Sequence, residues 1–184
     1  MAFDGIVIAN LVKDLNDKIV SGRISKIAQP EKDELLLISA NASLPLLYFT
    51  ETNKPSPLTA PNFCMLLRKH IANGRIVSVS QPGLERIVRI EIEHLDEMGD
   101  LKRKFLIVEL MGKHSNIIFC DDENKILDSI KHISAQVSSV REVLPGREYF
   151  IPHAGEKKDP LTITVEEFKE LIGKTPQNLS KALY

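Results

Sequence analysis

The feature that most constrains this chain is a nine-residue stretch that occurs twice, 52 positions apart. Residues Gly22 to Pro30 and Gly74 to Pro82 share Gly-Arg-Ile at the start and Gln-Pro at the end. Each copy follows a helical pattern and precedes an aliphatic run, Glu34 to Ile38 or Ile87 to Ile92. We predict two helix–strand–turn–strand units related by an approximate twofold axis. Coincidence is the alternative, because Gly often ends a helix and Pro often opens a turn.

This repeat, together with the length, predicts the fold class. Each unit leaves one face of its strands uncovered, so the economical arrangement packs two sheets against each other. We therefore expect an α+β fold, a two-layer β-sandwich with flanking helices and an internal helix–strand–strand repeat. A chain of 184 residues suits one domain, expected over residues 1–173, and residues 174–184 are expected to start a truncated helical domain.

The helices are marked by capping residues and by apolar spacing. Asp4 can cap a first helix that ends at Ser21-Gly22, and Thr59 can cap a second, with Pro61 in its first turn. A short third helix is expected to open at Thr164. The apolar residues of the first two recur every three or four positions: Ile8, Leu11, Val12, Leu15 and Ile19, then Phe63, Leu66, Leu67 and Ile71.

The region after Pro82 is rich in predicted strands. Apolar and charged residues alternate from Ile87 to Glu93, which predicts a half-buried strand. An apolar run from Phe105 to Leu110 predicts the next strand. A hairpin around an acidic turn is then predicted, with strands over Asn116 to Cys120 and Lys125 to Ile130.

Two short segments carry groups that could contact a ligand. Glu85-Arg86 stands at the entrance of a predicted strand, and an Arg there can fork to phosphate or stack on a base. The alternative is a surface ion pair of little energetic consequence. The loop from Met111 to Asn116 contains Gly, Lys, His and Ser and could hold a phosphate or a ribose hydroxyl. A plain polar hairpin connection is equally compatible with it.

Charge and motif content narrow the function classes. The chain has 24 Lys and Arg against 25 Asp and Glu, so nucleic acid could be held only by a local patch and not by bulk attraction. The five His residues lack metal-ligand spacing, and no nucleophile elbow, phosphate loop or dinucleotide fingerprint occurs. We therefore expect no enzyme activity, metal, cofactor or small-molecule substrate. With no signal peptide and no membrane-spanning apolar run, we expect a cytoplasmic chain without a membrane partner.

Six blocks in order resemble the amino-terminal domain of the NFACT family. The similarity runs from residue 1 to about residue 155. The blocks are Met1-Ala2-Phe3-Asp4-Gly5, Gly22-Arg23-Ile24-Ser25-Lys26-Ile27, Pro61 to His70, Gln81 to Val88, Val108 to Asn116 and Val143-Leu144-Pro145-Gly146.

The resemblance implies a function and a fold. It implies an RqcH-type ribosome-associated quality-control factor that binds an obstructed large ribosomal subunit carrying peptidyl-tRNA. Such a factor recruits tRNA, in bacteria alanine tRNA, and supports untemplated alanine tailing of the stalled chain. The implied fold is similar to the amino-terminal domain of formamidopyrimidine-DNA glycosylases. Those enzymes begin with Pro-Glu, whereas this chain begins with Met1-Ala2, so glycosylase chemistry is not implied.

The resemblance also implies RNA-binding residues. The family's acidic residue near the N-terminus falls on Asp4, and its Asp-Arg motif falls on Glu85 and Arg86, with Glu in place of Asp. The loop that contacts the tRNA anticodon arm falls on Glu109, Met111 and Lys113. Lys113 stands where relatives often have Arg, which keeps the charge and loses the fork geometry.

Two other functions remain open at this stage. Members of the family were formerly labelled fibronectin-binding protein A, which implies an adhesin for extracellular matrix. Such a protein must be exported, and the chain offers no export signal. The second is a base-excision repair enzyme of the glycosylase fold, against which the missing Pro-Glu start argues.

Overall fold

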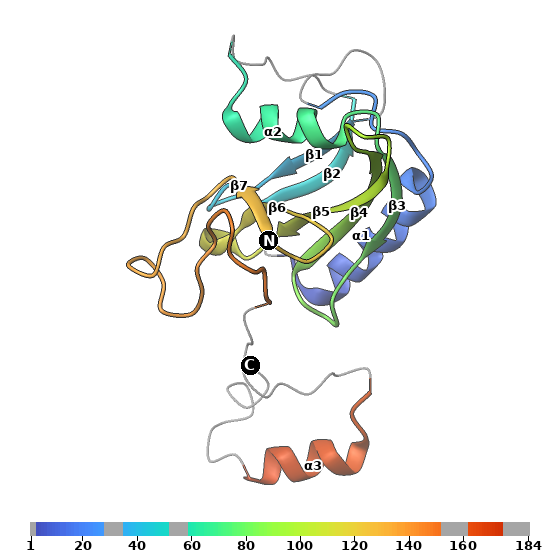
Figure 1. Cartoon of the computed structure of the whole chain (residues 1–184). Helices are drawn as coiled ribbons and strands as arrows, with labels where there is room; N and C mark the ends of the chain where they lie inside the picture. The colour runs from blue at the N-terminus through green and yellow to red at the C-terminus, as the bar shows by residue number, and fades with distance from the viewer. Residues whose placement is uncertain (1–2, 28–34, 52–58, 152–161, 175–184) are drawn as a thin grey trace. The chain divides into compact units, whose positions relative to one another are not determined.

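Both predicted helices of the repeat form in the computed structural model (Figure 1). The structure describes residues 3–27, 35–51, 59–151 and 162–174. Helix α1 (Gly5–Ile19) begins after Asp4, whose carboxylate accepts a 2.9 Å hydrogen bond from a first-turn amide, as predicted. Helix α2 (Asn62–Ile71) follows Pro61 and has no side-chain cap hydrogen bond, so the cap expected from Thr59 is wrong.

Directly after each helix, the two copies of the repeat pair with each other. Arg23 and Arg75 form an antiparallel bridge. Four backbone hydrogen bonds flank it in two matched pairs: Ser21 N to Ile76 O and Asn73 N to Ile24 O, both 2.8 Å, and Ile24 N to Gly74 O and Ile76 N to Gly22 O, both 2.9 Å. Ser21 and Asn73 also share a positive φ, 70° and 63°. We call the pairing of Ser21–Ile24 with Asn73–Ile76 the crossing. The predicted twofold axis is present there.

Beyond the crossing, the symmetry is incomplete. The second copy continues as strand β3 (Arg75–Ser80), whereas the first copy makes only the bridge at Arg23. The described residues 24–27 form no strand, so the first strand of the predicted helix–strand–turn–strand unit is not formed there. The Gln29-Pro30 end of the first copy lies outside the described residues.

The strands form two antiparallel sheets. The small sheet pairs β1 (Leu35–Ser39) with β2 (Leu46–Thr50), and β2 is a strand that the sequence patterns did not indicate. The large sheet has the order β3-β4-β5-β6-β7, with β4 (Ile87–Leu95), β5 (Leu101–Glu109), β6 (Asn116–Cys120) and β7 (Ile126–Ser129). The fold is therefore a mixed α+β arrangement of a five-stranded and a two-stranded sheet. The expected likeness to the glycosylase fold stays a prediction.

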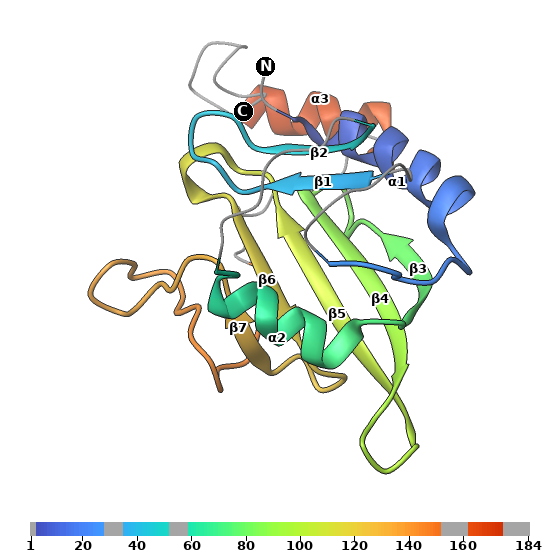
Figure 2. The same ribbon diagram turned by 90° about the horizontal axis from the view of Figure 1, so that it is seen from above.

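One face of the large sheet carries the main core. Figure 2 shows α1, α2 and the β1–β2 hairpin over the same face. Apolar side chains of alternate β4 residues meet the helices and Leu47 of β2 there, and helix residues Ile8 and Leu15 are fully buried. The β4 residues are Val88, Ile90 and Ile92, which the alternation predicted.

The other face of the large sheet is divided into an apolar and a charged half. Near the start of β4, residues Ile87, Ile107 and Ile118 pack with Val143 and Tyr149 from the segment that follows β7. Toward the β4–β5 turn, the face holds ion pairs instead. Arg75 bonds Glu93 at 2.8 Å, and Arg103 bonds Glu91 at 2.7 Å and Glu93 at 3.1 Å.

The chain divides into two units, Met1–Pro152 and His153–Tyr184. The second unit contains α3 (Val165–Lys174), the helix that was predicted to open at Thr164. The predicted domain boundary between residues 173 and 174 falls inside this unit and stays a prediction. Residues 175–184, expected to start a further domain, lie outside the described residues.

The two glycines of the crossing differ in the space around them, which gives a matched prediction. A Cβ would lie 2.9 Å from the Ile19 carbonyl oxygen at Gly22 and 3.0 Å from the Ile71 carbonyl oxygen at Gly74. Only the one at Gly74 would in addition lie 2.8 Å from Ile92 Cγ2 and 3.1 Å from the Glu93 carbonyl oxygen. We expect Gly74→Ala to lower the free energy of unfolding by about 1–3 kcal/mol, more than Gly22→Ala does. Urea denaturation of both variants measures this, and equal losses would contradict it.

Candidate nucleic-acid interface

The turn between β3 and β4 is fixed by one amide side chain. Gln81 Nε2 donates to the Gly5 carbonyl at 2.8 Å and to the Glu85 carbonyl at 2.9 Å. The Glu85 amide in turn donates to the Pro82 carbonyl at 3.1 Å. Gln81 therefore joins the turn that carries Glu85 and Arg86 to the first residue of α1.

The start of α1 lies directly against this turn. A Cβ on Gly5 would collide with the carbonyl oxygen of Leu84. Only glycine allows the helix and the turn to approach this closely. Asp4, one residue earlier, is exposed, and its carboxylate caps the helix. The N-terminal acid and the Glu85-Arg86 pair thus belong to one local structure.

The Met111–Lys113 loop adjoins the same turn on its other side. Leu110 N donates to the Arg86 carbonyl at 2.8 Å, which continues the β4–β5 pairing. A 3-10 turn (η1, Gly112–His114) follows, with Gly112 at φ 60°. Lys113 is exposed, and Met111 is half-buried.

Five of the six predicted RNA-binding residues therefore lie at or near the surface of one sheet end. Asp4 and Lys113 are exposed, and Glu85, Arg86 and Met111 are half-buried. Within the described part of the chain, the side chains of Glu85, Arg86 and Lys113 take part in no hydrogen bond or ion pair.

Glu109, the sixth predicted residue, differs from the other five because it is buried. Its side chain is 0 % exposed. It bonds the guanidinium of Arg141 and the hydroxyl of Tyr149. The structure therefore places Glu109 beneath the loop rather than on its surface. No sequence pattern pointed to Arg141 or Tyr149.

Hydrogen bonds of Lys131 and Asn116, which no sequence pattern indicated, hold the other end of the loop. Lys131 Nζ donates to the Ala40 carbonyl at 2.6 Å and to the Ser115 carbonyl at 2.7 Å. The buried Asn116 side chain binds the Lys131 backbone through both its nitrogen and its oxygen, at 2.9 and 3.0 Å. The loop is thereby fixed to the β1–β2 connection, and its backbone is preorganised.

Comparison with known proteins identifies the family. Residues 4–184 match the family model described as NFACT N-terminal and middle domains. The chain belongs to the NFACT family. It is 41 % identical over 180 residues to the Rqc2 homolog RqcH of Bacillus subtilis, covering 91 % of this chain and 32 % of that protein. The Rqc2 homolog RqcH of Streptococcus pneumoniae is 36 % identical over 185 residues, with 94 % and 34 % covered. This chain thus spans about a third of the length of these curated relatives.

Solved structures agree with this membership. The N-terminal domain of the fibronectin-binding protein PavA from Streptococcus pneumoniae superposes with a TM-score of 0.84 at 35 % identity, covering 99 % of this chain and 72 % of that one. The fibrinogen binding protein from Staphylococcus aureus gives a TM-score of 0.83 at 32 % identity, covering 100 % and 68 %. The NFACT fold of this chain is therefore shared along nearly its whole length.

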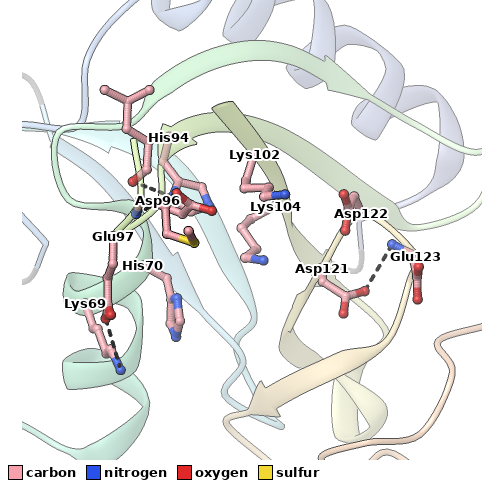
Figure 3. Close-up of a pocket in the computed structure, with 12 residues that line it drawn as sticks. Lys69, His70, His94, Asp96, Glu97, Lys102, Lys104, Asp121, Asp122 and Glu123 are labelled. Atoms are coloured by element: carbon pink, nitrogen blue, oxygen red, sulfur yellow. Dashed lines mark hydrogen bonds and ion pairs between the residues drawn. The ribbon is translucent and has the colours of Figure 1, made fainter. Parts of the chain in front are cut away.

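A cavity of about 590 Å³ lies at the other end of the large sheet of this NFACT chain (Figure 3). None of the predicted site residues lines it. Its walls come from the end of α2, the β4–β5 hairpin and the β6–β7 turn, and its charged lining is mixed: Lys69, Lys102, Lys104, Asp96, Glu97, Asp121, Asp122 and Glu123. Five acidic side chains outnumber three lysines, which distinguishes this cavity from a basic nucleic-acid groove.

Two histidines in this cavity have unusual surroundings. Burial, with the positive charges of Lys104 and Lys69, lowers the pKa of His70. His94 Nε2 is buried and has no hydrogen-bond partner in the described part of the chain. Across the same described residues, no group of three or more His, Cys, Asp and Glu side chains could hold a metal ion. No described helix is long and apolar enough to cross a membrane.

The bridging role of Gln81 yields a prediction. Gln81→Ala leaves two carbonyls at the α1–turn contact without their donor, so the free energy of unfolding should fall by about 1–2 kcal/mol. Ser80→Ala, at the neighbouring exposed position, is the control and should change it by less than about 0.5 kcal/mol. Thermal or urea unfolding compares the two, and equal effects would remove the bridge from the site's architecture.

Proposed function

We propose that this chain binds the anticodon arm of tRNA, through Arg86, Glu85 and the Met111–Lys113 loop. The observation that carries the proposal is the set of unengaged polar side chains at one sheet end. Arg86 and Glu85 have no partner in the described part of the chain, although Gln81 fixes their backbone. A guanidinium held in this way can fork to a phosphate or stack on a base.

We call Glu85, Arg86 and the Met111–Lys113 loop the proposed RNA-binding edge. The chemistry of this edge favours RNA loops over duplex RNA. Unpaired loop bases expose faces and edges that the deep, narrow major groove of an A-form stem hides. The proposed edge offers one guanidinium, one carboxylate and one ammonium, which suits the recognition of a few exposed groups. It does not offer the continuous basic surface that tracks a phosphate backbone. Asp4, whose carboxylate caps α1, contributes a further acceptor next to the same turn.

We further propose that the whole protein acts in ribosome-associated quality control in the cytoplasm. It binds an obstructed large ribosomal subunit carrying peptidyl-tRNA, recruits alanine tRNA and supports alanine tailing of the stalled chain. Support comes from relatives named Rqc2 homolog RqcH and, at 28 % identity, the human ribosome quality control complex subunit NEMF. Peptide-bond formation then belongs to the ribosome, and this chain contributes binding without catalytic residues.

A second candidate function follows from the names of the solved relatives, which are fibronectin- and fibrinogen-binding proteins. It requires the protein to reach the cell surface. Exposed apolar side chains at Val137 and Val140 are available for such a contact. Recovery of the protein with ribosomes or with the cell surface, after fractionation, separates the two functions.

The tRNA proposal predicts a loss of affinity when Arg86 is removed. Arg86→Ala in the purified protein should weaken tRNA binding by about 1–3 kcal/mol, because the fork to phosphate or base is lost. Lys102→Ala removes the same charge from an exposed position at the other end of the sheet and is the matched control. Lys113→Ala should instead weaken binding uniformly and reduce the salt dependence by about one counterion.

Fluorescence anisotropy at several salt concentrations measures these effects. Unchanged affinity in both Arg86→Ala and Lys113→Ala would remove the assignment. A loss in Lys102→Ala equal to that in Arg86→Ala would show that binding depends on overall charge and not on this edge.

A further inference from the structure

Glu109 carries a negative charge in an apolar part of the interior. It is the last residue of β5, pairs in register with Ile87 and Asn116, and is 0 % exposed. On this sheet face its neighbours form the apolar cluster that includes Ile107 and Val143. An ionised carboxylate can remain in such surroundings only if charged or hydrogen-bonding partners satisfy it.

Two residues far along the chain supply those partners. Arg141 Nη2 lies 2.5 Å from Glu109 Oε2, and Tyr149 donates its hydroxyl to Oε1 at 3.0 Å. Arg141 is itself only 8 % exposed, and its Nη1 donates to the Phe150 carbonyl at 3.0 Å. Both carboxylate oxygens of Glu109 are thus engaged inside the protein.

The ionisation behaviour agrees with this geometry. Burial alone would lower the pKa of the Arg141 guanidinium, but the hydrogen bond and charge of Glu109 raise it overall. Burial and the negative charge of Glu109 raise the pKa of the Tyr149 phenol. Tyr149 therefore stays a hydrogen-bond donor and Arg141 stays a cation across the physiological range.

The backbone next to Glu109 leads directly to the proposed RNA-binding edge. Leu110 N donates to the Arg86 carbonyl at 2.8 Å, and Met111 N donates to the buried Ser115 hydroxyl at 2.9 Å. The Met111 side chain packs against the same cluster as Tyr149. A shift of Glu109 would therefore move the backbone of Arg86 and the start of the loop together.

We infer that Arg141 and Tyr149 are positioning residues, which hold Glu109 as a buried anchor for Arg86 and the Met111–Lys113 loop, and that Glu109 does not touch RNA. This inference rests on the proposed function. It differs from a direct role of Glu109 in one measurable respect. If Glu109 contacted RNA directly, its own substitution would weaken binding, whereas the loss of the Tyr149 hydroxyl would not.

The test combines tRNA affinity with amide hydrogen exchange in the purified protein. Tyr149→Phe removes one hydroxyl and keeps the Glu109–Arg141 ion pair. Of these variants, it is therefore expected to disturb folding least. Arg141→Gln and Arg141→Lys form a second pair, in which only Lys keeps the charge. Ile126→Val is the control, since Ile126 is 1 % exposed in the same cluster and its loss of a methylene destabilises without touching Glu109.

We expect Tyr149→Phe to weaken tRNA binding about three- to tenfold. The amides of Leu110, Met111 and Ser115 should exchange at least about tenfold faster, while those of β3 keep their rates. Arg141→Lys should retain more affinity than Arg141→Gln. Ile126→Val should bind tRNA as the unsubstituted protein does, although its melting temperature falls.

The opposite results would overturn the inference. Affinity within twofold of the unsubstituted protein in Tyr149→Phe, with a loss in Arg86→Ala, would leave the proposed function standing and end the positioning role. Equal losses in Tyr149→Phe and Ile126→Val would reduce it to general destabilisation. If Arg86→Ala and Lys113→Ala have no effect, the proposed function fails instead, and the exchange rates alone decide whether the anchor holds the loop.

Discussion

The crossing of the two repeat copies is the interaction on which the arrangement of the helices and sheets depends. Four backbone hydrogen bonds join Ser21–Ile24 to Asn73–Ile76 in two matched pairs. Each copy ends its helix with a residue at positive φ followed by glycine, so both helices turn back in the same way. Because backbone groups at the crossing satisfy one another, α1 and α2 can both cover the same face of the large sheet without exposing unpaired amides.

This crossing also determines where Glu85 and Arg86, the residues of the proposed binding edge, lie. After the crossing, β3 leads to Gln81, whose side chain returns to the first residue of α1. The start of α1 and the β3–β4 turn are thus brought together by residues 76 positions apart in the chain. Glu85 and Arg86 are consequently presented on a rigid framework rather than on a long loop, which lowers the entropy cost of binding.

Sequence patterns predicted local structure well, but they did not identify contacts between residues that are far apart in the chain. The Asp4 cap and the alternation of Val88, Ile90 and Ile92 depend on neighbours within a few residues, and both were confirmed. The first copy forms no strand at residues 24–27, because its backbone pairing with the second copy ends at Ile24. Strand β2 was missed because the Leu46–Thr50 run has neither a clear alternation nor a turn dipeptide before it.

The sequence pointed to segments that the structure brings close together, but it did not show that Glu109 is buried. Glu109 lies near the end of the predicted strand Phe105 to Leu110, and its partners lie 32 and 40 residues later. No spacing rule relates them. Arginines form ion pairs with Glu91, Glu93 and Glu109. The carboxylates of Asp96 and Asp121 accept hydrogen bonds from backbone amides in turns. By contrast, the side chains of Arg86 and Lys113 have no partner among the described residues. The formal net charge of −1 is therefore compatible with a local surface at which two cationic side chains, Arg86 and Lys113, have no partner among the described residues. An even charge count for the whole chain is no argument against RNA binding.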